Sequence, residues 1–140
     1  MNVSEIMTGT VELVSPDTGV REAAKRMADE DVGALPVGAN DTLVGMVTDR
    51  DIALRSVAAG RQMDESSVED VMSNGVLYCF EDADCTDVAD NMARNQVRRL
   101  PVVNADKRLV GMVALADLAR AGFGERAAVG ISEPSAAARA

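Results

Sequence analysis

Two seven-residue stretches decide the fold of this chain, because each reads as the end of a strand followed directly by the start of a helix. The first reads Gly45-Met46-Val47-Thr48-Asp49-Arg50-Asp51, and the second reads Gly111-Met112-Val113-Ala114-Leu115-Ala116-Asp117. Both have the same apolar approach and the same closing aspartate, but the threonine of the first is an alanine in the second. We interpret the first stretch as a ligand-binding turn and the second as a weakened copy of it.

The similarity between the two halves extends well beyond these stretches. Residues 4–37 align with 69–102 at an offset of 65, with 10 identities in 34 positions. After a shift of one residue, 43–53 align with 109–119, with 7 identities in 11. Unrelated sequences of this composition agree at about one position in twelve. The chain therefore contains an internal duplication.

Each copy predicts a strand, a helix, two strands and a second helix. In the first copy we expect a strand at 11–14, a helix with an apolar stripe from Val20 that ends at Gly33, strands at 35–37 and 43–47, and a helix from Thr48 toward Gly60. In the second copy we expect a strand at 76–80, a helix with its stripe from Cys85, strands at 100–103 and 109–113, and a helix from about Leu115.

One copy of about 50 residues would bury too little apolar surface to fold well alone. We therefore expect an α/β (α+β) protein in which two tandem β-α-β-β-α repeats pack through their sheets with pseudo-twofold symmetry and leave two related clefts. The expected division is a first domain at 1–60, a linker at 61–68, a second domain at 69–121 and a flexible C-terminal tail at 122–140.

Composition narrows the classes of function. The formal net charge of −9 argues against nucleic acid, whose binding depends on Lys and Arg that neutralise phosphates. Apolar runs are far shorter than the ~18 residues of a membrane span, and the first residues do not have the basic start and apolar block of a secretory signal. We expect a cytoplasmic protein that binds neither nucleic acid nor membrane.

The number of cysteines and the lack of histidine limit the possible metal sites and redox chemistry. The only two cysteines, Cys79 and Cys85, are read as reduced structural thiols rather than as a disulfide or redox pair. With two isolated Cys and no His, a structural zinc site is not expected. The absence of His and of a nucleophile–base pattern also leaves catalysis without its usual groups, so we expect no catalytic residues and no enzyme activity.

The turn from Thr48 to Asp51 has two compatible interpretations. It is a capping box, in which the Thr48 side chain accepts from the Asp51 amide and the Asp51 side chain accepts from the Thr48 amide. It is also a phosphate site, because free amides and a hydroxyl at a helix start can bind phosphate oxygens, and a carboxylate one turn on can accept both hydroxyls of a ribose.

Two tandem copies, each with a start like Glu5-Ile6-Met7-Thr8, a middle Leu-Pro-Val and an end like Gly45 to Asp51, resemble a pair of CBS (cystathionine β-synthase) domains over roughly residues 3–120. More narrowly, residues 33–37 and 45–52 resemble the short stand-alone CBS-pair proteins that include the hypoxic response protein. The resemblance implies regulatory modules that bind an adenosine ligand, which is AMP, ADP, ATP, S-adenosylmethionine or NAD, in clefts between the two domains.

The resemblance also implies two sets of site residues. In the first site Thr48 would contact phosphate, Asp51 would bind ribose, and the walls would come from Met46, Ser73, Leu77, Val97 and Arg98. In the second, weaker site Asp117 and Arg99 would act with Met112, Thr8, Glu12, Val32 and Gly33. Arg98 and Arg99 are equally readable as solvated ends of a strand.

Neither site has the complete set of groups. The second site has Ala114 in place of the hydroxyl, and the first site has Ala34 where Arg99 stands in the other copy. A ligand held mainly by its adenosine part therefore fits the first site better than a triphosphate does.

Three functions follow from these observations. The first is an adenosine-nucleotide sensor that acts on a separate, unknown effector protein, and the second is a dimerising scaffold that has lost nucleotide binding. The third is an enzyme, which the missing catalytic groups disfavour. Because modules of this family commonly associate through their helices, we expect a homodimer.

Overall fold

The computed structural model describes residues 1–9, 13–126 and 128 of the chain. Its contacts divide the chain into two compact units. We call Glu12–Val76 the first-repeat unit, and Met1–Val11 together with Leu77–Ala140 the second-repeat unit.

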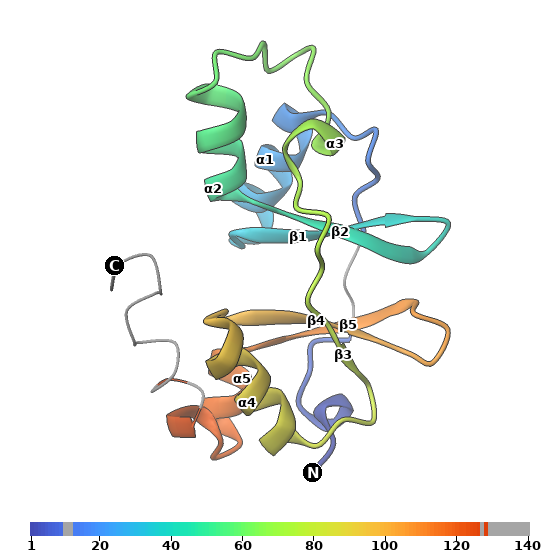
Figure 1. Ribbon diagram of the computed structural model, residues 1–140, viewed down its shortest axis with the longest axis vertical. Helices are drawn as coiled ribbons and strands as arrows, with labels where there is room; N and C mark the ends of the chain where they lie inside the picture. Colours follow the sequence, from blue (N-terminus) through green and yellow to red (C-terminus); the bar gives the residue numbers. More distant parts are fainter. Residues whose placement is uncertain (10–12, 127, 129–140) are drawn as a thin grey trace. The chain divides into compact units, whose positions relative to one another are not determined.

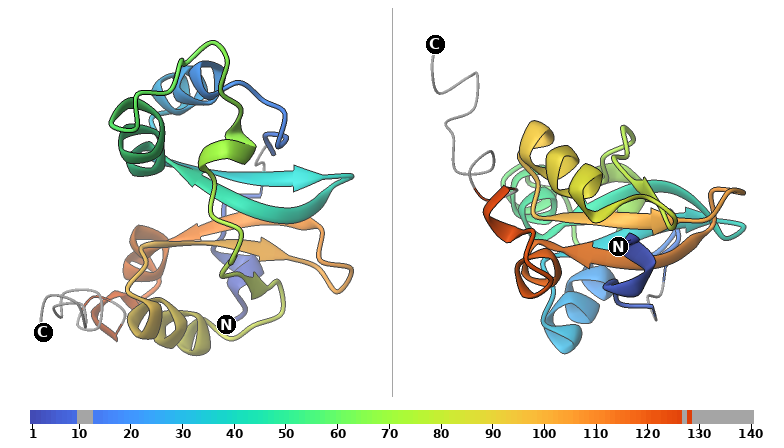
Figure 2. Two further views of the ribbon diagram at one scale, coloured as in Figure 1. Left: turned by 45° about the horizontal axis from the view of Figure 1, so that its top comes forward. Right: turned by 90° about the horizontal axis from the view of Figure 1, so that it is seen from below.

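The first-repeat unit is a β-hairpin with helices on one face (Figures 1 and 2). Its elements are α1 (Val20–Glu30), β1 (Ala34–Ala39), β2 (Thr42–Thr48), α2 (Asp49–Ile52), η2 (Ala53–Val57) and α3 (Val68–Val71). Strands β1 and β2 pair antiparallel. Asn40 and Asp41 have positive φ angles of 54° and 64°, as a two-residue hairpin turn requires.

The second-repeat unit repeats this plan with one more strand. Its elements are η1 (Val3–Glu5), β3 (Cys79–Phe80), α4 (Cys85–Asn95), β4 (Arg99–Val103), β5 (Leu109–Ala114) and α5 (Leu115–Arg120). The sheet order is β3-β4-β5, with β3 parallel and β5 antiparallel to β4. The helices α4 and α5 lie together on one face of this sheet (Figure 1).

The predicted mixed α/β fold is confirmed, and three local predictions need correction. Helix α1 ends at Glu30, before Gly33, because Asp31 takes the left-handed conformation (φ 53°) that ends a helix. The strand predicted at 76–80 is only Cys79–Phe80. The helix after Thr48 is α-helical only to Ile52 and continues as a π-helix, η2.

Two predicted segments include residues that the structure does not describe. Residues 11 and 12 of the predicted strand at 11–14 lie outside the described residues, and Val14 pairs with Val37 in an isolated parallel bridge. Of the predicted tail, residues 127 and 129–140 also lie outside the described residues. In the part of the chain that is described, no helix is long and apolar enough to cross a membrane.

The segment before the first strand of each repeat packs in the unit of the other repeat. Thr8 pairs with Met112 through N–H···O distances of 2.9 and 3.0 Å, and Ser73 pairs with Met46 through distances of 2.9 and 3.1 Å. These are equivalent positions of the two copies. The compact units group Met1–Val11 with the second repeat, and they group the predicted linker at 61–68 and the start of the predicted second domain with the first repeat. The domains at 1–60 and 69–121 stay a prediction.

Glycine makes this exchange sterically possible. A Cβ at Gly45 would lie 2.8 Å from the Ser73 carbonyl oxygen, and a Cβ at Gly111 would lie 2.7 Å from the Thr8 carbonyl oxygen. Both distances are shorter than real Cβ contacts, so only glycine lets the exchanged backbone approach these strands.

Each unit has its own apolar core. The first-repeat core gathers Val14, Val20, Ala23, Met27, Leu35, Val37, Val47, Ile52, Val68 and Val71. The second-repeat core gathers Val3, Cys79, Cys85, Val88, Ala89, Met92, Leu100, Val102, Val113 and Leu118. The apolar periodicity of the predicted helices and strands therefore predicted residues that are buried in the two cores.

The two cysteines are free thiols inside the second-repeat core, as predicted. Cys79 is 7% exposed and Cys85 is fully buried. Burial, with a smaller contribution from Cys85, raises the pKa of Cys79 to about 12. Burial likewise raises the pKa of Cys85. Both side chains therefore stay protonated and pack as small apolar groups.

Replacing Gly111 by alanine should destabilise the protein by about 1–3 kcal/mol, because the added methyl group overlaps the Thr8 backbone. Urea-induced unfolding measures this loss. Gly75→Ala is the matched control, since nothing lies within 4 Å of a Cβ there. It should change the free energy of unfolding by no more than about 0.5 kcal/mol. Equal effects of the two substitutions would contradict the close-approach argument.

The thiols should react slowly with Ellman's reagent at pH 8 in the folded protein and rapidly in urea, because the reactive thiolate is suppressed by burial. Unfolded thiols ionise near pH 9, below the folded pKa of Cys79 of about 12. The unfolded state then binds fewer protons, so the free energy of unfolding should fall as the pH rises through this interval. Equally fast labelling of folded and unfolded protein would show that the thiols are accessible.

Candidate functional site

The turn between β2 and α2 forms the capping box that its sequence predicts. The Asp51 N–H donates to Thr48 Oγ1 at 3.0 Å, and the Thr48 N–H donates to Asp51 Oδ2 at 3.0 Å. The Asp51 side chain is 14% exposed. These reciprocal bonds set the orientation of both side chains and leave the second carboxylate oxygen, Oδ1, without a role in the cap.

The strand segment before this turn is held on two sides. Met46, two residues before Thr48, exchanges both backbone hydrogen bonds with Ser73. On the other strand Ala34 is the register partner of Thr48. The Asp49 N–H donates to the Gly33 carbonyl at 2.9 Å. The position of the Thr48 hydroxyl is thus set by backbone contacts from two other segments.

Arg55 lies close to this turn but donates no hydrogen bond to it. Arg55, in η2, has its Nε 4.0 Å from Asp51 Oδ1, which is beyond hydrogen-bond distance. Its Nη1 instead donates to the carbonyl oxygens of Val71 and Met72 at 3.2 and 3.3 Å. These carbonyls are at the end of α3, where backbone acceptors have no helical partner. Arg55 therefore caps α3.

The second turn, between β5 and α5, has half of this arrangement. The Ala114 N–H donates to Asp117 Oδ2 at 2.8 Å, but alanine has no oxygen to accept the Asp117 N–H. Asp117 Oδ1 accepts from Arg120 Nη2 at 2.5 Å. Arg99 begins β4 as the register partner of Ala114, and its side chain is exposed.

The predicted site residues fall into groups. The structure brings Thr48, Asp51, Met46 and Ser73 together in the first-repeat unit. In the second-repeat unit it brings together Asp117, Arg99, Met112 and Thr8. Leu77, Val97 and Arg98 belong to the second-repeat unit, which does not contain the first turn. Val32 and Gly33 belong to the first-repeat unit, which does not contain the second turn, so the part of these residues in a site stays a prediction. Glu12 lies outside the described residues.

Sequence reasoning missed two side chains beside the carboxylates, Arg55 and Arg120. Each follows its aspartate on the same helical segment, at i+4 from Asp51 and at i+3 from Asp117. Such spacings place the side chains on one face of a helix. The signal was therefore present in the sequence, but only the structure shows that Arg120 donates a hydrogen bond to its aspartate whereas Arg55 forms only a longer ion pair.

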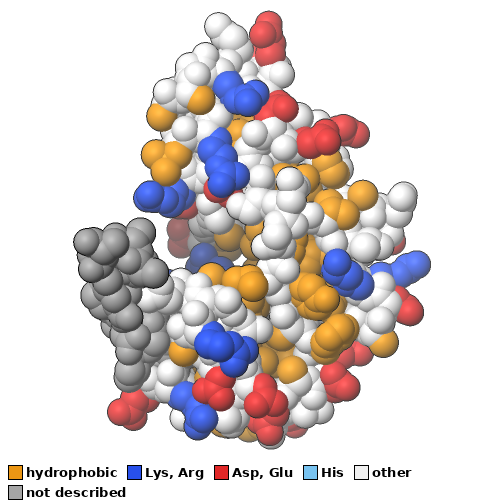
Figure 3. Space-filling model, viewed as in Figure 1, with side chains coloured by type: hydrophobic (Ala, Val, Ile, Leu, Met, Phe, Trp, Pro, Cys, Tyr) orange, Lys and Arg blue, Asp and Glu red, His pale blue; other side chains and the backbone are white. Residues whose placement is uncertain are grey.

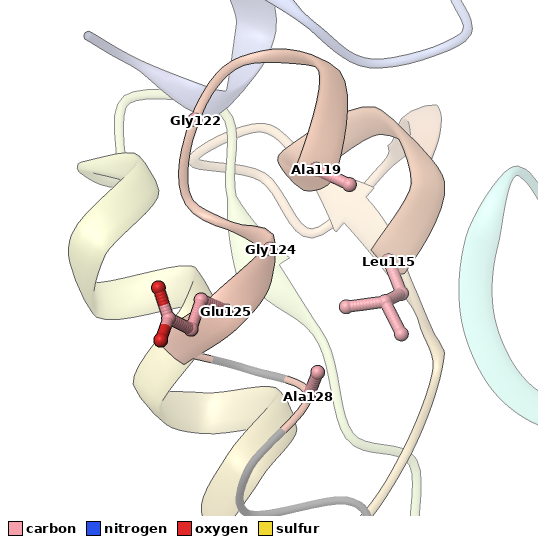
Figure 4. Close-up of a pocket in the computed structure, with 6 residues that line it drawn as sticks. All are labelled: Leu115, Ala119, Gly122, Gly124, Glu125 and Ala128. Atoms are coloured by element: carbon pink, nitrogen blue, oxygen red, sulfur yellow. The ribbon is translucent and has the colours of Figure 1, made fainter.

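Other surface features lie away from these turns. A hollow beside α5 is lined by Leu115, Ala119, Gly122, Gly124, Glu125 and Ala128, which Figure 4 shows as sticks. Asp117 is not among its lining residues. Hydrophobic side chains reach the surface between charged ones in Figure 3, and Leu54, Val57, Leu77 and Phe80 are all at least 40% exposed. No group of three or more potential metal ligands occurs within residues 1–9, 13–126 and 128.

Comparison with known proteins gives a family match over both repeats. The family model of the CBS domain matches residues 3–57 and again residues 68–124. The CBS domain-containing protein YhcV of Bacillus subtilis is 44% identical over 118 residues, which are 84% of this chain and 83% of YhcV. Hypoxic response protein 1 of Mycobacterium tuberculosis is 37% identical over 117 residues, 83% of this chain and 81% of that protein.

Solved structures agree with this match. The crystal structure of Hypoxic Response Protein I with two coordinated zinc ions has a TM-score of 0.79 at 36% identity, covering 86% of this chain and 98% of that chain. CBSX2 in complex with AMP has a TM-score of 0.74 at 28% identity. The CBS domain pair of MJ0100 in complex with 5′-methylthioadenosine and S-adenosyl-L-methionine has a TM-score of 0.76 at 27% identity. The matches to CBSX2 and to MJ0100 each cover 89% of this chain and 98% of the chain compared.

Thr48→Ala should lower the free energy of unfolding by about 1 kcal/mol, because the Asp51 amide loses its acceptor. Thr48→Ser keeps the hydroxyl and should have a much smaller effect. The converse change, Ala114→Thr, should add the missing half of the second box and stabilise the protein. Denaturant titration of the three variants tests this, and an unchanged Thr48→Ala would show that the capping bond does not contribute.

Proposed function

The chain belongs to the CBS domain family, and from this premise we propose that it is a regulatory module that binds an adenosine-containing nucleotide at the Thr48–Asp51 turn and acts on a partner protein. Proteins with CBS pairs are regulatory modules, and two structural neighbours of this chain hold AMP or S-adenosyl-L-methionine. The proposed role is a binding role, without catalysis by this chain.

The main support for the proposal is that the Asp51 carboxylate has one oxygen in the cap and one oxygen to which no described residue donates a hydrogen bond. Oδ2 is used by the cap, whereas Oδ1 has no donor within hydrogen-bond distance among the described residues. The side chain is nevertheless mostly buried, and the cap fixes its orientation. A fixed carboxylate with one open oxygen is suited to accept the hydroxyl groups of a ribose, since charge-assisted hydrogen bonds of this kind are strong.

The neighbouring groups favour the nucleoside part of a ligand over a long phosphate chain. Thr48 contributes one hydroxyl, which can donate to a phosphate oxygen while it accepts from the Asp51 amide. Its register partner across the hairpin is Ala34, which offers no charge. Arg55 is engaged with the carbonyls of α3. We therefore propose a ligand of the AMP or S-adenosylmethionine type rather than ATP.

The alternative function is a dimerising scaffold that has lost nucleotide binding. The observation that favours it is that each turn lacks one group, since Ala34 replaces the basic residue at the first and Ala114 replaces the hydroxyl at the second. The homodimer and the effector protein stay predictions under both alternatives. The two functions differ in one measurable property, the affinity for adenosine ligands.

Asp51→Asn should weaken AMP binding at least about tenfold, because the hydrogen bonds of a charged acceptor to the ribose contribute about 1.5–3 kcal/mol. Asparagine keeps an oxygen for the Thr48 amide, so the cap should persist. Isothermal titration calorimetry with AMP and S-adenosylmethionine measures the affinity. A thermal-shift assay supports it, because a ligand at 100 times its dissociation constant stabilises the folded state by about 2.7 kcal/mol.

The matched control is Asp41→Asn, which removes the same charge from the exposed hairpin turn of the same unit, where asparagine tolerates the positive φ. It should leave the affinity unchanged. Asp117→Asn should weaken binding less than Asp51→Asn does. If the wild-type protein shows no binding of AMP, ADP, ATP, S-adenosylmethionine or NAD at millimolar concentration, the scaffold function replaces the sensor.

A further inference from the structure

The two repeat-related carboxylates, Asp51 and Asp117, differ in what reaches their second oxygen. In both, Oδ2 accepts the backbone N–H of the residue at the cap, at 3.0 Å for Asp51 and 2.8 Å for Asp117. At Asp117 the other oxygen accepts from Arg120 Nη2 at 2.5 Å. At Asp51 the other oxygen forms an ion pair with Arg55 Nε at 4.0 Å, which is too long for a hydrogen bond. The second oxygen of Asp117 is therefore hydrogen-bonded to an arginine, whereas that of Asp51 has only a longer ion pair and no hydrogen bond among the described residues.

The repeat alignment identifies the residues that cause this difference. Under the shift that aligns 43–53 with 109–119, Arg120 corresponds to Leu54, and Arg55 corresponds to Ala121. The second repeat thus has its arginine at i+3 from the aspartate, where it folds back onto the carboxylate. The first repeat has its arginine at i+4, where the carbonyls of Val71 and Met72 hold the guanidinium.

The Asp117–Arg120 pair has a direct consequence for a ligand at the second turn. A ribose hydroxyl that bonds to Asp117 Oδ1 must share that oxygen with, or displace, a guanidinium that already satisfies it. It also meets a carboxylate whose charge is balanced. At the first turn, Arg55 forms an ion pair with Asp51 Oδ1 at 4.0 Å but donates no hydrogen bond to it, so a ribose hydroxyl meets no guanidinium that it must displace from this oxygen.

We propose that Arg120 is a specificity-determining residue that occupies Asp117 and directs the adenosine ligand to the first repeat. This inference rests on the proposed function and adds a selection between the two turns. The Arg120 side chain is 73% exposed, and exposed ion pairs contribute up to about 1 kcal/mol, which corresponds to about fivefold in affinity. Arg120 therefore biases the choice of site, and the hydroxyl that Ala114 lacks accounts for further weakening.

The test exchanges the two equivalent residues, Leu54 and Arg120. Arg120→Leu frees the second carboxylate, and it is measured in an Asp51→Asn background so that only the second turn reports. Leu54→Arg places an arginine at i+3 from Asp51 and is measured in an Asp117→Asn background. Leu54 is 51% exposed, so both exchanges are at the surface and should leave the fold intact, which circular dichroism and urea unfolding verify.

Calorimetric titration with AMP should show about three- to fivefold tighter binding after Arg120→Leu and a similar weakening after Leu54→Arg. Arg120→Lys keeps a cation within reach of Asp117 and should behave more like the wild type than Arg120→Leu. Arg94→Leu, at an exposed position of α4, controls for net charge and should have no effect. Because exposed charges are screened, the effect of Arg120→Leu should shrink in 1 M salt, whereas a merely structural change would persist.

The outcomes separate this inference from the proposed function. If the wild-type protein binds AMP and both exchanges leave the two affinities unchanged, the role of Arg120 is overturned while the nucleotide site stands. If Arg94→Leu tightens binding as much as Arg120→Leu does, general electrostatics replaces the specific ion pair. If neither the wild type nor Arg120→Leu binds AMP, ADP, ATP, S-adenosylmethionine or NAD at millimolar concentration, both proposals are overturned.

Discussion

The backbone exchange of Met46 with Ser73, and of Met112 with Thr8, is the contact on which the rest of the structure depends. Each unit completes its sheet with a segment from the other copy, so a repeat of the sequence is not by itself a folded body. The contact is possible only because Gly45 and Gly111 leave room for the incoming carbonyl groups. Two equivalent glycines thus permit the same backbone contact in both units.

The same exchange determines the surroundings of the candidate turn. Ser73 fixes Met46 on one side of β2, and two residues later Thr48 leaves the strand and caps α2. Capping and the proposed binding use the same two side chains in different ways, because the cap needs the Thr48 hydroxyl only as an acceptor and only one carboxylate oxygen of Asp51. Stabilising the helix start therefore also orients the groups proposed to bind the ligand.

The two copies have diverged at the positions that touch their turns while the cores and the exchange contacts kept their pattern. The second turn has no hydroxyl at Ala114, and its carboxylate is paired with Arg120. At the first turn the hydroxyl is present, and Arg55 is held by the end of α3. The two equivalent carboxylates therefore differ in their surroundings, since Asp117 accepts a hydrogen bond from an arginine and Asp51 does not.

Sequence by itself determined the duplication, the mixed α/β fold, the apolar faces and the Thr48–Asp51 cap, because periodicity and capping are local properties of the chain. It also placed Cys85 in the core, by alignment with Val20. Only the tertiary structure decided that Met1–Val11 groups with the second repeat and that Glu12–Val76 forms one unit, since hydrogen bonds between distant segments leave no local pattern. It alone also decided which arginine hydrogen-bonds to its aspartate, because folding brings the carbonyls of Val71 and Met72 to Arg55, which donates to them instead.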